Sequence, residues 1–216
     1  MSKLALASLS GLGGAAGIGG GIYLLNKDSK SPVATKEASE TIQSKLQKEK
    51  FKILDIGASE WGEIKDKYNS LKSDASKVFN VSSDELNEHA LKDLCKEHLN
   101  KSEFDDALYS KVKRWCVTPV TVSSHLSNWG LTSLSTDSSN NNNQKELTAL
   151  AKKYATADNK IKGVDTLESE QWRSLQTKCK DIGGKKNYDD DFDSLFESSK
   201  TWCTTEGFNA LPKENK

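Results

Sequence analysis

The sequence predicts a mainly α-helical protein in which an N-terminal transmembrane helix precedes a helical domain of two tandem, diverged halves, each containing an α-hairpin. Three observations predict this fold: an uncharged apolar segment at the N-terminus, five amphipathic patterns of helical period, and cysteines, tryptophans and aspartates that recur in the same order. With 216 residues, of which 35% are hydrophobic and 29% charged, the chain is long enough to bury a core.

The apolar segment covers residues 4–25 and reads LALASLSGLGGAAGIGGGIYLL, without a charged residue. As a helix it spans roughly 33 Å, which is close to the hydrocarbon thickness of a bilayer. We therefore expect residues 1–25 to be a transmembrane segment or signal anchor in contact with the lipid bilayer. Gly13, Gly17 and Gly21 recur every four residues, and this stripe favours close packing with a second helix and hence homo-oligomers.

Two other interpretations of this segment stay open from the sequence. Alanine and glycine fill most positions after Gly11, so a cleaved secretory signal is an alternative, as is a soluble glycine-rich tail. The orientation is also open, because Lys3 favours a cytoplasmic N-terminus whereas lysines just beyond the segment favour the opposite one.

The remainder divides into a polar stalk and helical linker at 26–50, a first helical half at 51–128 and a second helical half at 129–216. The spacing of apolar residues predicts helices over 84–99, 102–116, 145–156, 166–180 and 189–203. Strand signals are few, chiefly over 116–122, where Pro119 weakens them. The run STDSSNNNNQ at 135–144 predicts a low-complexity loop.

The strongest feature of the domain is its internal similarity. Cys-Lys-acid followed after six residues by aromatic-Asp-Asp, and later by Trp-Cys, occurs twice: at 95–97, 104–106 and 115–116, and at 179–181, 188–190 and 202–203. Trp61-Gly62 and Trp129-Gly130 are candidate starts of the two halves. The order of so many residue types predicts a diverged tandem duplication.

Each half contains two cysteines, one at the end of one predicted helix and one directly after a tryptophan at the end of the next. The simplest disulfide framework pairs Cys95 with Cys116 and Cys179 with Cys203, and would staple each hairpin. Four cysteines allow three connectivities, and four reduced buried thiols are the alternative if the domain is cytoplasmic.

We predict no catalytic residue, no metal site and no cofactor. Cys95, His98 and His89 lie on one predicted helix, but the second half has Ile182 where His98 would fall, so the set is not repeated. The aspartates at 105–106 and 189–191 lie at the starts of predicted helices, which favours capping and interaction with the helix dipole over acid–base chemistry or calcium binding. No phosphate-binding or dinucleotide motif is present.

The charge of the chain gives no reason to expect nucleic acid as a partner. Lysine plus arginine and aspartate plus glutamate both number 31. Short basic clusters have acidic residues close by in the sequence, and we expect them to be solvated surface: Lys111, Lys113 and Arg114, then Lys152 and Lys153, then Lys185 and Lys186.

The opening MSKLALASLSGLGGAAGIGGGIYLL, followed by a lysine-rich domain with Trp-Cys pairs, resembles the uncharacterised paralogous membrane-anchored proteins of haemotropic mycoplasmas. The resemblance is most specific over the first 25 residues. It implies a membrane-anchored surface protein that contacts host cells or takes part in antigenic variation, and it carries over no catalytic residue.

The leading hypothesis is therefore a non-enzymatic, surface-exposed interaction or antigen protein in the cell membrane, single-pass, with its soluble domain extracellular and a host-cell surface component as partner. Two alternatives belong to other classes. One is a membrane-tethered hydrolase that uses the aspartates, and the other is an intracellular membrane-bound scaffold.

Overall fold

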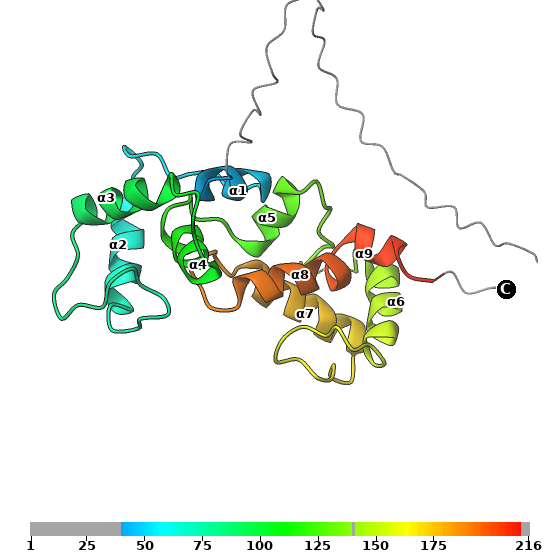
Figure 1. The fold of residues 1–216 in the computed structure, drawn as a ribbon. Helices are drawn as coiled ribbons and strands as arrows, with labels where there is room; N and C mark the ends of the chain where they lie inside the picture. The colour runs from blue at the N-terminus through cyan, green and yellow to red at the C-terminus, as the bar shows by residue number, and fades with distance from the viewer. Residues whose placement is uncertain (1–39, 140, 213–216) are drawn as a thin grey trace, which may run out of the picture. The chain divides into compact units, whose positions relative to one another are not determined.

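The computed structural model describes residues 40–139 and 141–212, which belong to the compact unit Ala38–Lys216. These residues are mainly helical, as the sequence predicts, and contain no named strand. Figure 1 shows the helices, whose bounds are α1 Ile42–Lys48, α2 Trp61–Ser70, α3 Glu88–Leu99, α4 Asp106–Trp115, α5 Val122–Asn128, α6 Gln144–Tyr154, α7 Gln171–Gly183, α8 Phe192–Trp202 and α9 Thr205–Asn209.

The five predicted helices correspond to α3, α4, α6, α7 and α8, with shifts of a few residues at their ends. The helices α2, α5 and α9 were not predicted. Two of these, α5 and α9, are short and polar, and they begin where Thr121 and Thr204 accept a backbone hydrogen bond from the third residue on. Over 116–122 the structure has two isolated bridges rather than a strand, Ile53 with Val117 and Thr121 with Lys186.

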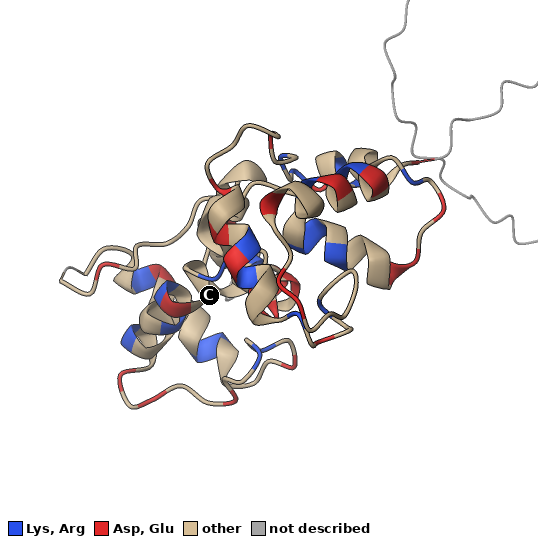
Figure 2. Cartoon of the chain, turned by 90° about the vertical axis from the view of Figure 1, so that its left-hand side faces the viewer, with Lys and Arg blue, Asp and Glu red and all other residues tan. Residues whose placement is uncertain are grey.

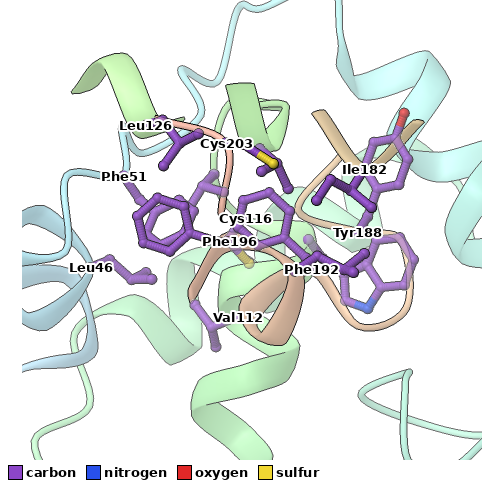
Figure 3. Packing of buried hydrophobic residues seen from close by; sticks show 14 of the residues in the cluster. Leu46, Phe51, Val112, Cys116, Leu126, Ile182, Tyr188, Phe192, Phe196 and Cys203 are labelled. Atoms are coloured by element: carbon purple, nitrogen blue, oxygen red, sulfur yellow. The ribbon is translucent and has the colours of Figure 1, made fainter. Parts of the chain in front are cut away.

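In Figure 1, α2 and α3 lie at one end of this unit, α6 and α9 lie at the other, and α4, α5 and α8 lie between them. Apolar side chains from both parts form one buried cluster. Figure 3 shows residues of α1, α4, α5 and α8 meeting in it, among them Leu46, Val112, Leu126, Phe192 and Phe196. The core therefore joins the two halves of the domain.

The same aromatic contact occurs twice in this core. Tyr68 of α2 meets the edge of Trp115 of α4 at 5.2 Å between ring centroids, and Tyr154 of α6 meets Trp202 of α8 at 4.8 Å. Each indole N–H donates to a backbone carbonyl of the loop after the tyrosine helix, that of Lys77 at 2.6 Å and that of Asn159 at 2.7 Å. Hence α2 and α4 are equivalent in packing to α6 and α8.

The backbone around each Trp-Cys pair is also repeated. The Leu54 N–H donates to the Cys116 carbonyl at 3.0 Å, and the Leu134 N–H donates to the Cys203 carbonyl at 2.9 Å. Two residues after each cysteine, a second backbone hydrogen bond completes the bridge. The Thr118 N–H donates to the Lys52 carbonyl and the Thr205 N–H donates to the Thr132 carbonyl, both at 2.8 Å.

This register extends to the helices that precede the bridges. Thr41 and Thr121 cap α1 and α5, and after each helix the chain turns through a residue with positive φ. In the first half this residue is Lys50, at φ 65°, whereas the second half has Gly130 there, at φ 72°, a conformation that costs glycine little. The N–H of the residue that follows, Phe51 or Leu131, donates to a carbonyl inside the helix.

By these contacts, the segment from Thr41 to the bridge at Val117 matches the segment from Thr121 to the bridge at Thr204, and we call these two segments the first and the second half of the fold. The buried face of α2, formed by Trp61, Ile64 and Tyr68, matches that of α6, formed by Leu147, Leu150 and Tyr154. Trp61 thus corresponds in packing to Leu147, whereas Trp129, 44% exposed, follows α5.

Candidate functional site

Each half of the domain contains one disulfide bond. Cys95 of α3 bonds Cys116 after α4, and Cys179 of α7 bonds Cys203 after α8. Of the three connectivities that four cysteines allow, this is the one that staples each hairpin, and no cysteine is free. The bonds join residues 21 and 24 positions apart, so the loop-entropy model gives each about 3 kcal/mol of stabilisation.

The two halves meet at the segment between α7 and α8, residues 184–191, which we call the junction loop. Its buried Asn187 lies between the halves. The Asn187 side chain accepts from the Val120 N–H at 2.9 Å and donates to the carbonyls of Lys113 and Arg114 at 3.1 and 3.2 Å. It thereby satisfies the last carbonyls of α4 and the linker to α5 together.

Ion pairs surround Asn187. Asp190 accepts from Lys77 at 2.7 Å and from Arg114 at 3.3 Å, and these contacts hold the pKa of the Asp190 carboxyl below its usual range. On α2, Glu63 accepts from Lys186 at 2.5 Å and from the Tyr188 hydroxyl, and both hydrogen bonds lower the pKa of the Glu63 carboxyl. These two carboxyls are therefore ionised at neutral pH and act as acceptors.

The aspartates singled out in the sequence have different roles in the two halves. Asp105 caps α4, as predicted, by accepting from the Leu108 N–H at 2.7 Å. The prediction of capping is wrong for 189–191. Asp191 precedes α8 with φ 65° and makes no capping hydrogen bond, and it pairs with Lys162 at 2.6 Å instead. A capping side chain normally sits on extended backbone, as Asp105 does, and the left-handed backbone of Asp191 departs from that geometry.

The two aspartate groups do not share a site. Asp105 and Asp106 begin α4, whereas Lys113 and Arg114, which pair with Asp193 and Asp190, end it. The ten residues of α4 place its two ends, and hence the two groups of aspartates, roughly 13 Å apart. In the described residues the carboxylates of the junction loop pair with lysine or arginine or cap a backbone N–H, an arrangement that holds the halves together.

The basic clusters differ from the expectation of solvated surface in two of the three cases. Lys113 and Arg114 have side chains only 13% and 18% exposed, and they bind the carboxylates of Asp193 and Asp190. Lys186 pairs with Glu63 across the junction. Sequence spacing missed these pairs because the partners come from distant parts of the chain. Lys152 and Lys153 are exposed on α6, as expected.

The three residues considered as zinc ligands in the sequence, Cys95, His89 and His98, have unrelated structural surroundings. Cys95 is in a disulfide, His89 is exposed beside Asp93 at 3.0 Å, and His98 packs on Phe79 with ring centroids 4.9 Å apart. Burial lowers the pKa of the His98 imidazole. The described part of the chain contains no group of three or more histidine, cysteine or acidic residues placed to hold a metal ion.

The sequence reading missed His125 of α5, which is 2% exposed. Its ring stacks on Phe51 at 4.2 Å and packs against Phe192 and Phe196, and its Nε2 accepts from the Trp129 indole N–H at 3.3 Å. Burial lowers the pKa of His125 to about 4. The sequence signals that could have predicted α5, and with it a buried His125, are the capping Thr121 and the apolar Val122 and Leu126.

Two grooves lie on equivalent faces of α2 and α6. The first, about 700 Å3, lies between α2 and the junction loop and is lined mainly by charged and polar residues. The second, about 730 Å3, lies between α6 and the residues at and after α9 and is mainly apolar. The helix residues that line them occupy the same positions in packing: Glu63, Asp66, Lys67 and Ser70 in the first groove, and Ala149, Lys152, Lys153 and Thr156 in the second.

The predicted helix-packing stripe of Gly13, Gly17 and Gly21, with the whole segment 1–25, lies outside the described residues. Within 40–139 and 141–212, no helix combines the length and apolarity that a bilayer span requires. Comparisons with protein-family models, with curated proteins and with solved structures find no match to this chain.

Proposed function

We propose that the chain is a single-pass membrane-anchored protein whose disulfide-bonded helical domain faces the outside of the cell and acts as an interaction or antigen module. The observation that carries this proposal is the pair of disulfides, one in each half. Structural disulfides persist in oxidising compartments, and a thiol-rich cytoplasm keeps such cysteines reduced. The apolar segment 4–25 supplies the anchor in the lipid bilayer.

A diverged tandem duplication is part of this proposal. It is supported by the repeated Tyr–Trp contact, the repeated disulfide and the repeated bridge after each Trp-Cys pair. These contacts lie in the core, while some exposed positions differ between the halves, as with Asp66 and Lys152. A repeated frame that carries different surface residues suits recognition or antigenic variation.

The surface of the domain favours a protein or other host-cell surface component as the partner over nucleic acid. Figure 2 shows acidic and basic residues interspersed along the helices, without one continuous basic face in that view. Nucleic-acid binding depends on neutralising phosphates with clustered lysine and arginine. In the junction, these residues are instead paired with carboxylates.

The experiment that tests the proposal combines protease shaving of intact cells with thiol labelling of the native full chain. We expect a protease added outside to remove the domain, and a maleimide to label no cysteine until a reductant is added. Protection from the protease together with four reactive thiols would support the intracellular scaffold instead. The aspartates give the hydrolase alternative no support, because Asp105 and Asp106 lie at the opposite end of α4 from Asp190, and Asp190 is held in ion pairs with Lys77 and Arg114.

A further inference from the structure

The surface at the end of the second half is the counterpart of the surface that binds the junction loop. In the first half, the carbonyls of Lys113 and Arg114, at the end of α4, accept from Asn187. Counted from the Trp-Cys pairs, the equivalent carbonyls at the end of α8 are those of Lys200 and Thr201. Any residue that contacts these two carbonyls takes the place of Asn187.

Helix α9 fills this place. A Cβ atom added to Gly207 would lie 2.1 Å from the Thr201 oxygen and 2.6 Å from the Lys200 oxygen, so only glycine allows α9 to pack there. Thr204 caps Gly207, and the Glu206 carboxylate accepts from the Thr132 N–H at 2.8 Å. Helix α9 therefore covers the end of α8 as the junction loop covers the end of α4.

The first half presents a loop equivalent to the junction loop, residues 100–106, which follow α3 as 184–190 follow α7. The backbone holds both loops alike: the Ile42 N–H donates to the Lys101 carbonyl at 3.0 Å, and the Val122 N–H donates to the Lys185 carbonyl at 2.8 Å. Within the described residues, most of the side chains of 100–106 are exposed. In the described part of the chain this loop thus presents exposed side chains, whereas 184–190 bind the end of α4.

The side chains of the loop 100–106 and of the α6 face are matched. Where Tyr188 donates to Glu63, the equivalent pair is Phe104 and Ala149, in which hydroxyl and carboxylate are both lost. Where Lys67 pairs with Asp189 at 3.8 Å, the equivalent pair is Lys153 and Asp105. The first pair is thus apolar where the junction has a hydrogen bond, and the second pair keeps its opposite charges, so neither pair opposes contact between the two surfaces.

One position opposes such a contact. The equivalent of Asn187 is Glu103, and an ionised carboxylate is only an acceptor, so it cannot bond the carbonyls of Lys200 and Thr201. We infer that α9 and Glu103 together close the two ends of the domain against head-to-tail association with a second copy of this chain. The latent docking surface is the α6 and α8 face beneath α9, and its partner is the loop 100–106 of the second copy. Such a contact is heterologous, so it would propagate.

The test uses the full chain and removes both obstacles to association, the cover of α9 and the carboxylate of Glu103. In the double variant Gly207→Ala, Glu103→Asn, the added methyl displaces α9 and the amide restores a donor. We expect sedimentation velocity to show concentration-dependent oligomers beyond any association of the wild type, at least tenfold tighter than in Gly207→Ala alone. A zero-length carbodiimide cross-link should join Lys153 of one copy to Asp105 of another.

The control adds Lys153→Glu to the double variant, which should abolish the oligomers, and compares it with Lys180→Glu on the exposed side of α7, which should not. The inference is overturned if the double variant sediments as the wild type does, or if its association survives Lys153→Glu. Limited proteolysis reports whether α9 has been displaced. Continued protection of 205–212 in the Gly207→Ala variant would also overturn the inference, because it would show that α9 does not depend on that contact.

Discussion

At the scale of single residues, His125 is a neutral base held in an aromatic cage. Phe51, Phe192 and Phe196 surround its ring, and the charges of Lys113 and Asp193 act on it with opposite sign. Burial is the larger effect and lowers its pKa from 6.5 to about 4. Because the folded state resists protonation, the unfolded state binds more protons between these two values.

Because the unfolded state takes up the extra proton, the domain should lose stability as the pH falls from 6.5 to about 4. His125 contributes up to roughly 3 kcal/mol to this loss. The variant His125→Phe keeps an aromatic ring and removes the titration. We expect its free energy of unfolding in urea to fall less than that of the wild type between pH 7 and pH 4.5. The half-buried His98, whose pKa burial also lowers, acts in the same direction, so some dependence remains.

The control for this prediction is His89→Gln, since the His89 side chain is 88% exposed. Its pH dependence should match that of the wild type. If His125→Phe and the wild type lose stability in parallel, another group controls the acid response.

At the scale of elements, each disulfide joins the two helices of one hairpin. The pairs Cys95→Ala with Cys116→Ala, and Cys179→Ala with Cys203→Ala, remove one bond each. We expect each double variant to lose about 3 kcal/mol, because the loops closed in the unfolded chain are of similar length. Urea unfolding under non-reducing conditions measures the loss.

Reduction supplies the control for the disulfide variants. Under dithiothreitol, the wild type should lose stability, while a quadruple cysteine-to-alanine variant should not change. A wild type that unfolds identically with and without the reductant would contradict the prediction that the two bonds constrain the unfolded chain.

The repeated tryptophans give a second prediction at this scale. Trp115 and Trp202 are fully buried, and each indole N–H bonds a loop carbonyl. Changing either one to phenylalanine leaves that carbonyl unpaired and the site underfilled, at a cost of roughly 2 to 4 kcal/mol. The two variants should lose similar stability in thermal or urea unfolding, because their surroundings match.

Trp129→Phe is the matched control, since Trp129 is 44% exposed. If Trp129→Phe lost as much stability as the variants of the buried tryptophans, burial would not be the reason for their loss. Unequal losses from Trp115→Phe and Trp202→Phe would argue against equivalent packing of the two halves.

At the scale of the whole molecule, Asn187 couples the halves through three hydrogen bonds to backbone groups. Asn187→Ala leaves the Val120 N–H and two carbonyls without their partner, so we expect a loss of roughly 2 to 3 kcal/mol. The loss should appear as earlier or separate unfolding of one half, measured by hydrogen exchange of α2 and α6.

The equivalent position in the first half provides the comparison. Glu103 is exposed, and Glu103→Ala should change stability by less than about 0.5 kcal/mol. Equal effects of the two alanine variants would show that the junction loop does not bind the halves together as described.

Much of the domain followed from local sequence. The helices α3, α4, α7 and α8 have strong amphipathic spacing, and Asp105 stands directly before one of them as a cap. The disulfide pairing followed because each pair of cysteines bounds one hairpin, and a local pairing closes the shortest loops. Helix α5 was missed because its seven residues carry too short an apolar pattern.

The sequence by itself determined the helical class, the hairpins and the recurrence of Cys, Trp and Asp, since each depends on residues close together in the chain. Only the tertiary structure decided that Asp190 binds Lys77 and Arg114, that Asn187 joins the halves and that α9 covers the end of α8. These contacts join distant segments, and the same residue type serves as a cap in one half and an ion-pair partner in the other. Local pattern carries no information about which distant group will be near, because packing of the whole core sets that distance.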